Sequence, residues 1–415
     1  MIYVATHNNV AGWGEKSIEN IKAAQLGDDV QVVIQQTTPE GTKRIHIGGG
    51  NMSETEMGSD VDSGDAGTLV DFAKWGKQVA PAEKYALVLW SHGSGWAPGE
   101  IQGIKLERSV TQPFTADEFN TRSAQGGRYN IFFTPSMRHI LENDSPTERD
   151  IAFDNGTGHS LDTVELGKAL TKIKRSLGQP VDLLGMNACL MATVEIVYEV
   201  KDSATVYVAS EELMPAESWP YTEILTDLGN SPCLDSVGLS KLIVEKYDAF
   251  FKALDVDLTE RGIDGATLTA VRVNGIAPLA ERVKTLATAL MADIDEQMGP
   301  VYDAQLLTTQ FQNGHKSYHL YDLGMFCDKL AQMEETSAPV KEAAEAIVAQ
   351  LSDPDFILAE AHTAAADDGI MGLTTYLMEP VGAKLSPFYG HTAYARETGW
   401  GAFLQAYFTA VENAG

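Results

Sequence analysis

The sequence predicts an α/β fold with a mainly parallel central sheet. Over the first 230 residues, strand signals alternate with helix signals, which is the order of βαβ winding. Two apolar runs, at 85–90 and 180–187, have the length and composition of strands buried on both faces of a parallel sheet. From residue 231 the pattern becomes helical with short strands between the helices. We therefore expect two domains, 1–230 and 231–415, of which the second is helix-rich.

The elements expected in the first domain follow in chain order. Strands are predicted at 1–6, 30–35, 85–90, 180–187 and 205–209, and helices at 15–25, 68–78, 163–177 and 192–198. The helix at 68–78 places Leu69, Phe72 and Trp75 on one apolar side. Residues 36–66 are polar and glycine-rich around a Gly48–Gly50 run, which predicts a hairpin and a loop.

The second domain alternates long helices with short strands. Helices are predicted at 237–254, 277–297, 338–351 and 400–411, and strands at 267–271, 317–320 and 372–377. We expect these strands to extend the central sheet or to form a companion unit. Within the first domain, between the strands predicted at 85–90 and 180–187, residues 97–150 carry turn residues and scattered arginines without a clear period. A weakly patterned insertion of this length is usually functional or mobile.

Composition excludes several classes of protein. The net charge of −28 argues against binding to nucleic acid or to anionic membranes. No stretch of 18 apolar residues is present, so a membrane span is not expected. The first residues predict a strand rather than a signal peptide, and three cysteines in a chain of 415 residues suggest a reducing compartment. We therefore expect a cytoplasmic location.

Each of the two apolar strands runs into a residue that can take part in acyl transfer. His92, followed by Gly93, comes after the first strand, and Cys189 comes after the second. Because parallel strands carry their sites at their carboxyl ends, we expect the imidazole and the thiol to lie close together. They would serve as general base and nucleophile, with the backbone N–H groups of Gly93 and Cys189 as an oxyanion hole. Alone, each residue is more often a core histidine or an inert buried cysteine, but the pair at equivalent strand ends favours an active site.

The sequence around these residues resembles the clostripain family of cysteine peptidases, within the superfamily that includes caspases, gingipains and legumains. The matching strings are 84–96 and 187–195 around the two candidate residues, together with 8–9, 67–72, 162–166, 209–212, 219–221 and 398–400. The resemblance covers most of the chain except residues 97–150. It implies a caspase-like α/β/α sandwich and an endopeptidase with a His92/Cys189 dyad that forms a thioester acyl-enzyme.

The resemblance also implies protein or peptide substrates that are cleaved after arginine or lysine, and we expect arginine to be favoured if its guanidinium is bound bidentately. Family members often carry an acidic residue two positions before the cysteine, where this chain has the neutral Asn187. Another carboxylate is then needed, because a buried guanidinium without a partner is costly. The residues expected to line the substrate pocket are Asn187, Ser210, Glu211, Glu212 and Glu217.

Residues 97–150 are expected to hold the enzyme as a zymogen. The segment leaves the histidine strand and returns before the cysteine strand, so both of its ends lie near the expected active site. Cleavage by the enzyme itself, or by an upstream activating protease, would fall at one of its arginines. The candidates are Arg108, Arg122, Arg128, Arg138 and Arg149. The alternative is a surface insertion with no regulatory role.

Two other functions stay open on the same scaffold: a catalytically silent interaction protein, and a peptide ligase or transpeptidase that uses the same dyad. No cofactor is expected to be required, and calcium dependence is implied by the resemblance alone. The acidic loop Asp60–Asp65 begins like a calcium loop, but Gly64 occupies a ligand position, so the EF-hand pattern fails. His315 and His319 have the i,i+4 spacing of a helical metal pair, yet they lie in a strand-like stretch.

Overall fold

The computed structural model describes residues 1–8, 10–93, 95–96, 161–254, 265–313, 316–363, 369–378, 385–386 and 389–414. These residues form two compact units. The first comprises 1–188 and 216–239, and the second comprises 189–215 and 240–415. The insertion at 97–150, with its five arginines, lies outside the described residues, and the domain boundary at residue 230 stays a prediction.

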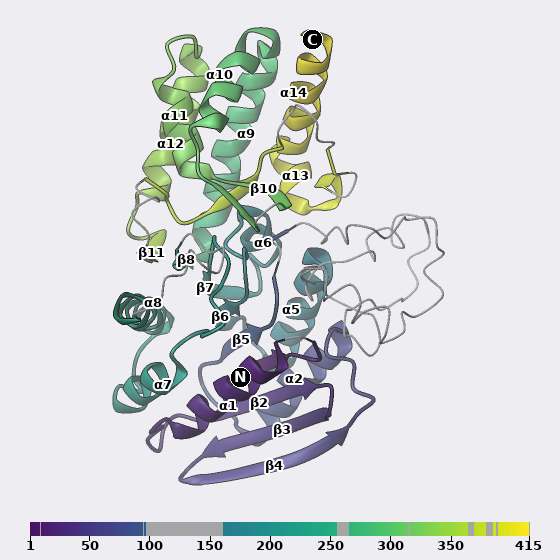
Figure 1. Cartoon of the computed structure of the whole chain (residues 1–415), viewed down its shortest axis with the longest axis vertical. Helices are drawn as coiled ribbons and strands as arrows, with labels where there is room; N and C mark the ends of the chain where they lie inside the picture. The colour runs from purple at the N-terminus through teal and green to yellow at the C-terminus, as the bar shows by residue number, and fades with distance from the viewer. Residues whose placement is uncertain are drawn as a thin grey trace. The chain divides into compact units, whose positions relative to one another are not determined.

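The first unit is built on a sheet with a parallel centre. Its strands are β1 (Ile2–Ala5), β2 (Val32–Thr38), β3 (Gly41–Gly48), β4 (Asn51–Gly58), β5 (Ala86–Trp90) and β6 (Val181–Asn187). Their order is β6-β5-β1-β2-β3-β4 (Figure 1). The pairs β6–β5, β5–β1 and β1–β2 are parallel, while β2–β3 and β3–β4 are antiparallel. The parallel centre confirms the predicted α/β class.

Helices cover both faces of this sheet. They are α1 (Ala11–Ala23), α2 (Ala66–Val79), α5 (Thr163–Leu177) and α7 (Tyr221–Asn230). Going from β1 to β2, the chain moves along the sheet toward its β4 edge. Going from β4 to β5 and from β5 to β6, it moves in the opposite direction, toward β6. Right-handed crossovers therefore place α1 on one face and α2 and α5 on the other. The packing agrees, because α2 contacts α5 and α1 contacts α7.

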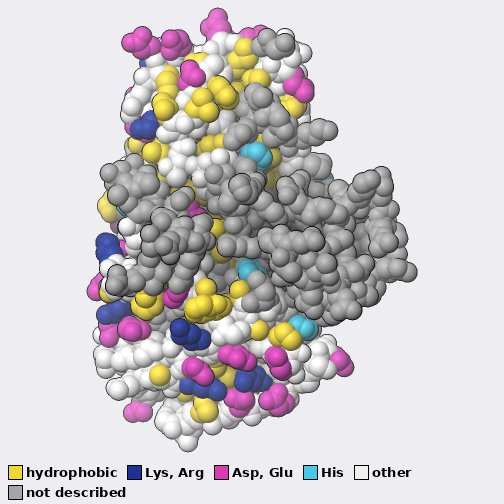
Figure 2. Space-filling view, in the orientation of Figure 1, with side chains coloured by type: hydrophobic (Ala, Val, Ile, Leu, Met, Phe, Trp, Pro, Cys, Tyr) yellow, Lys and Arg dark blue, Asp and Glu magenta, His cyan; other side chains and the backbone are white. Residues whose placement is uncertain are grey.

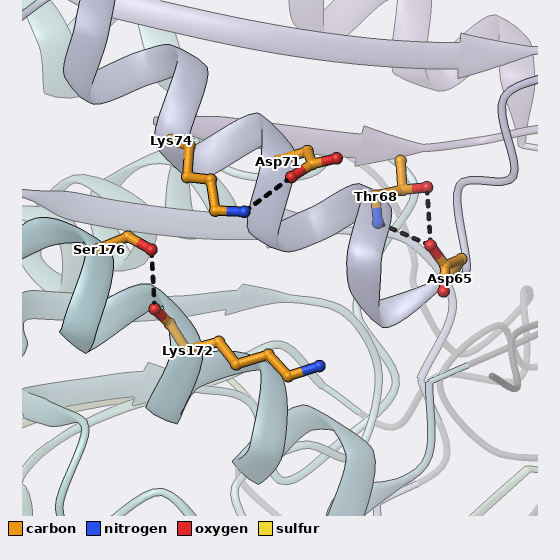
Figure 3. Close-up of polar contacts among 6 residues, drawn as sticks. All are labelled: Asp65, Thr68, Asp71, Lys74, Lys172 and Ser176. Carbon is orange, nitrogen blue, oxygen red and sulfur yellow. Dashed lines mark hydrogen bonds and ion pairs between the residues drawn. The ribbon is translucent and has the colours of Figure 1, made fainter. Parts of the chain in front are cut away.

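The two helices on the second of these faces begin at aspartate caps. The Asp65 carboxylate accepts hydrogen bonds from the Thr68 N–H at 2.8 Å and from the Thr68 hydroxyl at 3.2 Å (Figure 3). Asp162 caps α5 in the same way, accepting from the Glu165 N–H at 2.7 Å. The last residue of the acidic Asp60–Asp65 loop is thus a helix cap, in keeping with the failed calcium pattern. Gly178 ends α5 with a left-handed backbone, φ +85°.

The antiparallel edge of the sheet is made by two tight hairpins. Gly49 and Gly50 both have positive φ, +56° and +70°, and join β3 to β4, as the glycine run predicts. On β4, the Glu54 carboxylate pairs with Lys22 at 3.3 Å and with Lys43 at 3.4 Å. Acidic and basic side chains are accordingly mixed over this part of the surface (Figure 2).

The described strands of the second unit pair antiparallel in two groups. In one, β7 (Ala204–Ala209), β8 (Thr267–Arg272) and β11 (Ile357–His362) lie in the order β11-β8-β7. In the other, β9 (Gln310–Asn313), β10 (Lys316–Asp322) and β12 (Thr374–Tyr376) lie in the order β12-β10-β9. The strand predicted at 267–271 therefore extends the sheet that begins with β7, whereas those predicted at 317–320 and 372–377 form a separate small sheet.

Helices are the main elements of the described part of the second unit. They are α6 (Val194–Glu199), α8 (Ser236–Ala253, which starts in the first unit), α9 (Ile276–Ala292), α10 (Ile294–Leu306), α11 (Leu323–Gln332), α12 (Ala338–Leu351), α13 (Ala393–Thr398) and α14 (Trp400–Ala414). The single helix predicted at 277–297 is wrong. The backbone at Asp293 leaves the helical region, with φ −135° and ψ 46°, and separates α9 from α10. Helix α9 is the centre of the packing and contacts α12, α13 and α14.

Candidate active site

The two candidate residues follow neighbouring parallel strands at the same level. Trp90 and Asn187, the last residues of β5 and β6, are paired in register. The Ser91 N–H continues the ladder by donating to the Asn187 carbonyl at 3.3 Å. His92 and Cys189 each come two positions after this register pair. The carboxyl ends of adjacent parallel strands are where open α/β sheets carry their sites.

On the first unit, the residues around His92 are closely packed. His92 is half-buried and Gly93 is buried. Trp96 is 2 % exposed, and its carbonyl accepts a hydrogen bond from the Thr163 hydroxyl at the start of α5, at 3.3 Å. This bond ties the turn that follows His92 to the helix that precedes β6.

Asn187 lies in a buried polar network rather than on the surface. It is 2 % exposed, and its amide nitrogen donates to the Tyr221 hydroxyl at 3.0 Å and to the Ser218 hydroxyl. The Trp90 indole N–H also donates to Ser218, at 2.7 Å. Ser218 has a left-handed backbone, φ +68°, which aims its hydroxyl at this network. Burial raises the pKa of Tyr221, so its phenol stays neutral.

The second unit begins with the turn that carries the thiol. Cys189 is half-buried and outside any disulfide. Leu190, which follows it, is fully buried and has a left-handed backbone, φ +62°, which is uncommon for a residue with a side chain. The segment after β7 lies alongside this turn: the Leu190 N–H donates to the Glu212 carbonyl at 3.1 Å, and the Ala192 N–H donates to the Ser210 carbonyl at 2.9 Å.

Backbone atoms of the same segment contact the sulfur. The Met214 N–H donates to the Cys189 sulfur, with an N···S distance of 3.2 Å. The Met214 carbonyl oxygen lies 3.9 Å from the same sulfur. Met214 gave no signal in the sequence, because a backbone contact does not depend on the side chain that carries it.

The expected pocket residues divide between structural and candidate roles. The Ser210 hydroxyl is buried between the Glu212 carbonyl at 3.0 Å and the Thr267 hydroxyl at 2.9 Å. The Glu212 carboxylate accepts from the Leu213 N–H at 2.6 Å, so it stabilises its own loop. Glu217 is half-buried and belongs to the first unit.

Glu211 lies beside a second acid that the sequence did not indicate. Glu211 is 1 % exposed, and its carboxyl group acts on the pKa of Asp322, which is fully buried at the end of β10. Asp322 also accepts from the Met325 N–H at 2.5 Å and from the Met371 N–H at 2.7 Å. Burial raises the pKa of Asp322 to about 6, and these hydrogen bonds oppose the rise. Two buried carboxyl groups that lie close together do not both ionise easily, so one of the two is expected to hold a proton near neutral pH.

Metal ligands do not gather anywhere in the described ranges. No group of three or more His, Cys, Asp or Glu side chains among these residues is able to hold a metal ion. His315 lies outside the described residues, and His319 lies on a strand, β10, as expected. Calcium dependence therefore finds no ligand set in this part of the chain and stays a prediction.

A sheet with a parallel centre lies between helical layers, and a histidine and a cysteine follow its neighbouring strands by two positions, which is the pattern expected of a caspase-like cysteine peptidase. The sequence model of the clostripain family of peptidases matches residues 2–124 and 131–405. The chain therefore belongs to the clostripain family of cysteine peptidases, as the sequence predicts. No curated protein matches the chain in sequence.

Solved structures with the same fold cover nearly the whole chain. A secreted C11 cysteine protease from Bacteroides thetaiotaomicron, bound to an irreversible peptide inhibitor, has a TM-score of 0.66 at 14% identity, over 97% of this chain and 98% of that one. An inactive zymogen C11 protease from Parabacteroides distasonis has a TM-score of 0.64 at 17% identity, over 96% of both chains. At these identities the likeness establishes the fold.

No helix in the described part of the chain is long and apolar enough to cross a membrane. The Bacteroides neighbour is described as secreted, so the expected cytoplasmic location of this chain receives no support from it and stays a prediction.

Proposed function

We propose that the chain is an endopeptidase in which Cys189 is the nucleophile and His92 is the general base and acid. The observation that carries the proposal is the register of β5 and β6, which ends both strands at the Trp90–Asn187 pair. Each candidate residue follows its strand by the same two positions, and both are half-buried, as residues that meet a substrate need to be.

The reaction follows from these roles. His92 takes the thiol proton of Cys189, and the thiolate attacks the scissile carbonyl carbon. The backbone N–H groups of Gly93 and Cys189 stabilise the oxyanion of the tetrahedral intermediate. His92 then gives its proton to the leaving amine, and a thioester acyl-enzyme forms. Water, deprotonated by His92, hydrolyses the thioester and restores the thiol.

Two single substitutions test the dyad. Cys189→Ala and His92→Ala are each expected to abolish cleavage of a labelled peptide library while leaving the thermal unfolding midpoint nearly unchanged, because neither side chain belongs to the fully buried core. Wild-type turnover in either variant would contradict the assignment. Adding an amine nucleophile to the wild type separates hydrolysis from peptide ligation, since a ligase would give joined product.

We further propose that the enzyme cleaves after arginine in preference to lysine, with Glu211 as the acid that binds the basic side chain. Glu211 directly precedes Glu212, whose carbonyl is bonded to Leu190 next to the nucleophile. Its carboxyl acts on the pKa of Asp322, so an arriving guanidinium would meet two acids and release the proton that one of them holds. Glu212 is less suited because its carboxylate is bonded to a backbone N–H of its own loop.

Three matched variants test this specificity: Glu211→Gln, Glu212→Gln and Glu217→Gln. We expect only Glu211→Gln to lower kcat/KM for arginine peptides strongly while sparing peptides with norleucine at the same position. Equal losses on both peptides would indicate a structural role. A wild-type preference for apolar or acidic residues would refute the proposed pocket as a whole.

We also propose that the chain is a zymogen, activated by cleavage between His92 and Cys189, by itself or by an upstream protease. The family membership and the C11 zymogen among the solved neighbours support this proposal. Replacing all five arginines of 97–150 by glutamine is expected to give an uncut chain without activity. An uncut and fully active variant would refute it.

A further inference from the structure

The backbone of Met214 contacts the sulfur that the proposed function makes the nucleophile. The N···S distance of 3.2 Å is short, whereas the carbonyl oxygen of the same residue is 3.9 Å away. A hydrogen-bond donor close to sulfur stabilises the thiolate more than the thiol. The more distant oxygen opposes this effect only weakly, because electrostatic interactions fall with distance.

A buried tyrosine holds Met214 in this position. The Tyr247 hydroxyl, on α8, donates to the Met214 sulfur at 3.3 Å. Tyr247 is fully buried, and its ring packs against Phe251 with centroids 4.6 Å apart. Burial raises the pKa of Tyr247, and the charges of Cys189 and Glu212 raise it further, so the phenol keeps the proton that it donates.

The chain on both sides of Met214 is fixed as well. Leu213 is 3 % exposed, and its N–H is bonded to the Glu212 carboxylate at 2.6 Å. Pro215 follows, and a residue that precedes proline is restricted to extended backbone. Met214 is thus anchored by its neighbours along the chain and by Tyr247 through its side chain, which leaves its N–H aimed at the thiol.

We infer that the Met214 N–H is a catalytic group that stabilises the Cys189 thiolate, and that Tyr247 is a positioning residue that holds Met214 against the sulfur. The inference rests on the proposed role of Cys189 as nucleophile. A thiolate is the reactive form of cysteine, so the contact would raise the share of active enzyme near neutral pH. Tyr247 is close enough to Cys189 and to Glu212 for their charges to raise its pKa, and a charged Glu212 acts against the thiolate.

The test measures the thiol itself rather than peptide cleavage. The rate of Cys189 alkylation by iodoacetamide is followed from pH 5 to 9, with the modified cysteine identified by mass spectrometry. Replacing Met214 by its α-hydroxy analogue turns one amide into an ester, which removes the N–H and makes the Leu213 carbonyl a weaker hydrogen-bond acceptor. We expect this variant to be alkylated about tenfold more slowly at pH 6, because hydrogen bonds to charged groups have this magnitude.

Tyr247→Phe keeps the ring and removes the bond to Met214. We expect about a threefold slower alkylation at pH 6 and the same plateau rate at high pH. The matched control is Tyr198→Phe, which loses the hydrogen bond to Glu397 but does not contact Met214. A purely structural role of Tyr247 would lower the thermal midpoint without moving the pH midpoint of alkylation.

Two outcomes separate this inference from the proposed function. If the ester variant and Tyr247→Phe keep the wild-type pH midpoint, the inference is overturned whatever the peptidase does. If Cys189→Ala still cleaves peptides, the proposed nucleophile is wrong, whereas the alkylation profiles still report the Met214 contact. All profiles are repeated in a His92→Ala background, which removes the contribution of the imidazole.

Discussion

Asp322 should make the stability of the second unit depend on pH. Its pKa is raised from 3.8 to about 6, chiefly by burial, so the folded chain binds a proton that the unfolded chain has already lost between these values. The contribution of Asp322 to the free energy of unfolding is therefore largest below pH 4, and this contribution is lost as the pH rises to about 6. A shift of about two units corresponds to about 3 kcal/mol.

The variant Asp322→Asn removes this titration. It also removes one of two oxygens that accept backbone N–H groups, so we expect it to be less stable than the wild type at pH 4. The free energy of unfolding of the wild type minus that of Asp322→Asn should fall by about 3 kcal/mol between pH 4 and pH 8, because the wild type loses the contribution of the bound proton. Urea unfolding followed by far-UV circular dichroism measures it, with Asp303→Asn on the surface of α10 as control. A difference that stays constant or grows with pH would refute the reasoning.

Three further predictions concern residues close to Cys189 in the sequence. Asn187→Asp is expected to fold, because the hydroxyls of Ser218 and Tyr221 are able to donate to a carboxylate. We expect this variant to raise the ratio of kcat/KM for arginine peptides to that for norleucine peptides, and an unchanged ratio would contradict the prediction. Glu195→Ala should lower the free energy of unfolding by about 3 kcal/mol, since the buried carboxylate accepts three hydrogen bonds, from two hydroxyls and a backbone N–H, while Glu195→Gln should cost clearly less. Gly185→Ala should cost about 2 kcal/mol in urea unfolding, because its Cβ would lie 2.7 Å from the Trp219 ring; a neutral result would show that the ring moves.

The strand ends that carry the candidate dyad were predictable from sequence, because a fully apolar run signals a strand buried on both faces. The helix α5 begins and ends where its aspartate cap and its C-terminal glycine indicate. The same local signals failed between α9 and α10, where residues with helical propensity continue through the break at Asp293. Local pattern therefore located the elements better than their ends.

The chemistry around the strand ends was only partly predictable. Glu211 and Glu212 are adjacent and identical in type, yet one acts on the pKa of Asp322 and the other caps a backbone N–H. Asp322 and Tyr247 come from distant parts of the chain, and neither has a motif around it that would announce a role. Which acid faces which partner is set by tertiary packing, and a single sequence contains no signal for it.

The free edge of the first unit carries its own protection against association. Every residue of β4 is exposed, so its backbone offers a template to another strand. Two copies of β4 that are related by a twofold axis perpendicular to the sheet pair antiparallel, and each residue then lies on the same face of the sheet in both copies. In the registers that pair most of the strand, Glu54 then lies opposite Glu54 or opposite Glu56 of the other copy. Like charges directly opposite each other destabilise a pair of strands. The glutamates of β4 therefore disfavour pairing between two copies of this chain, but they do not disfavour pairing with a strand that carries no acidic residue at the opposite positions.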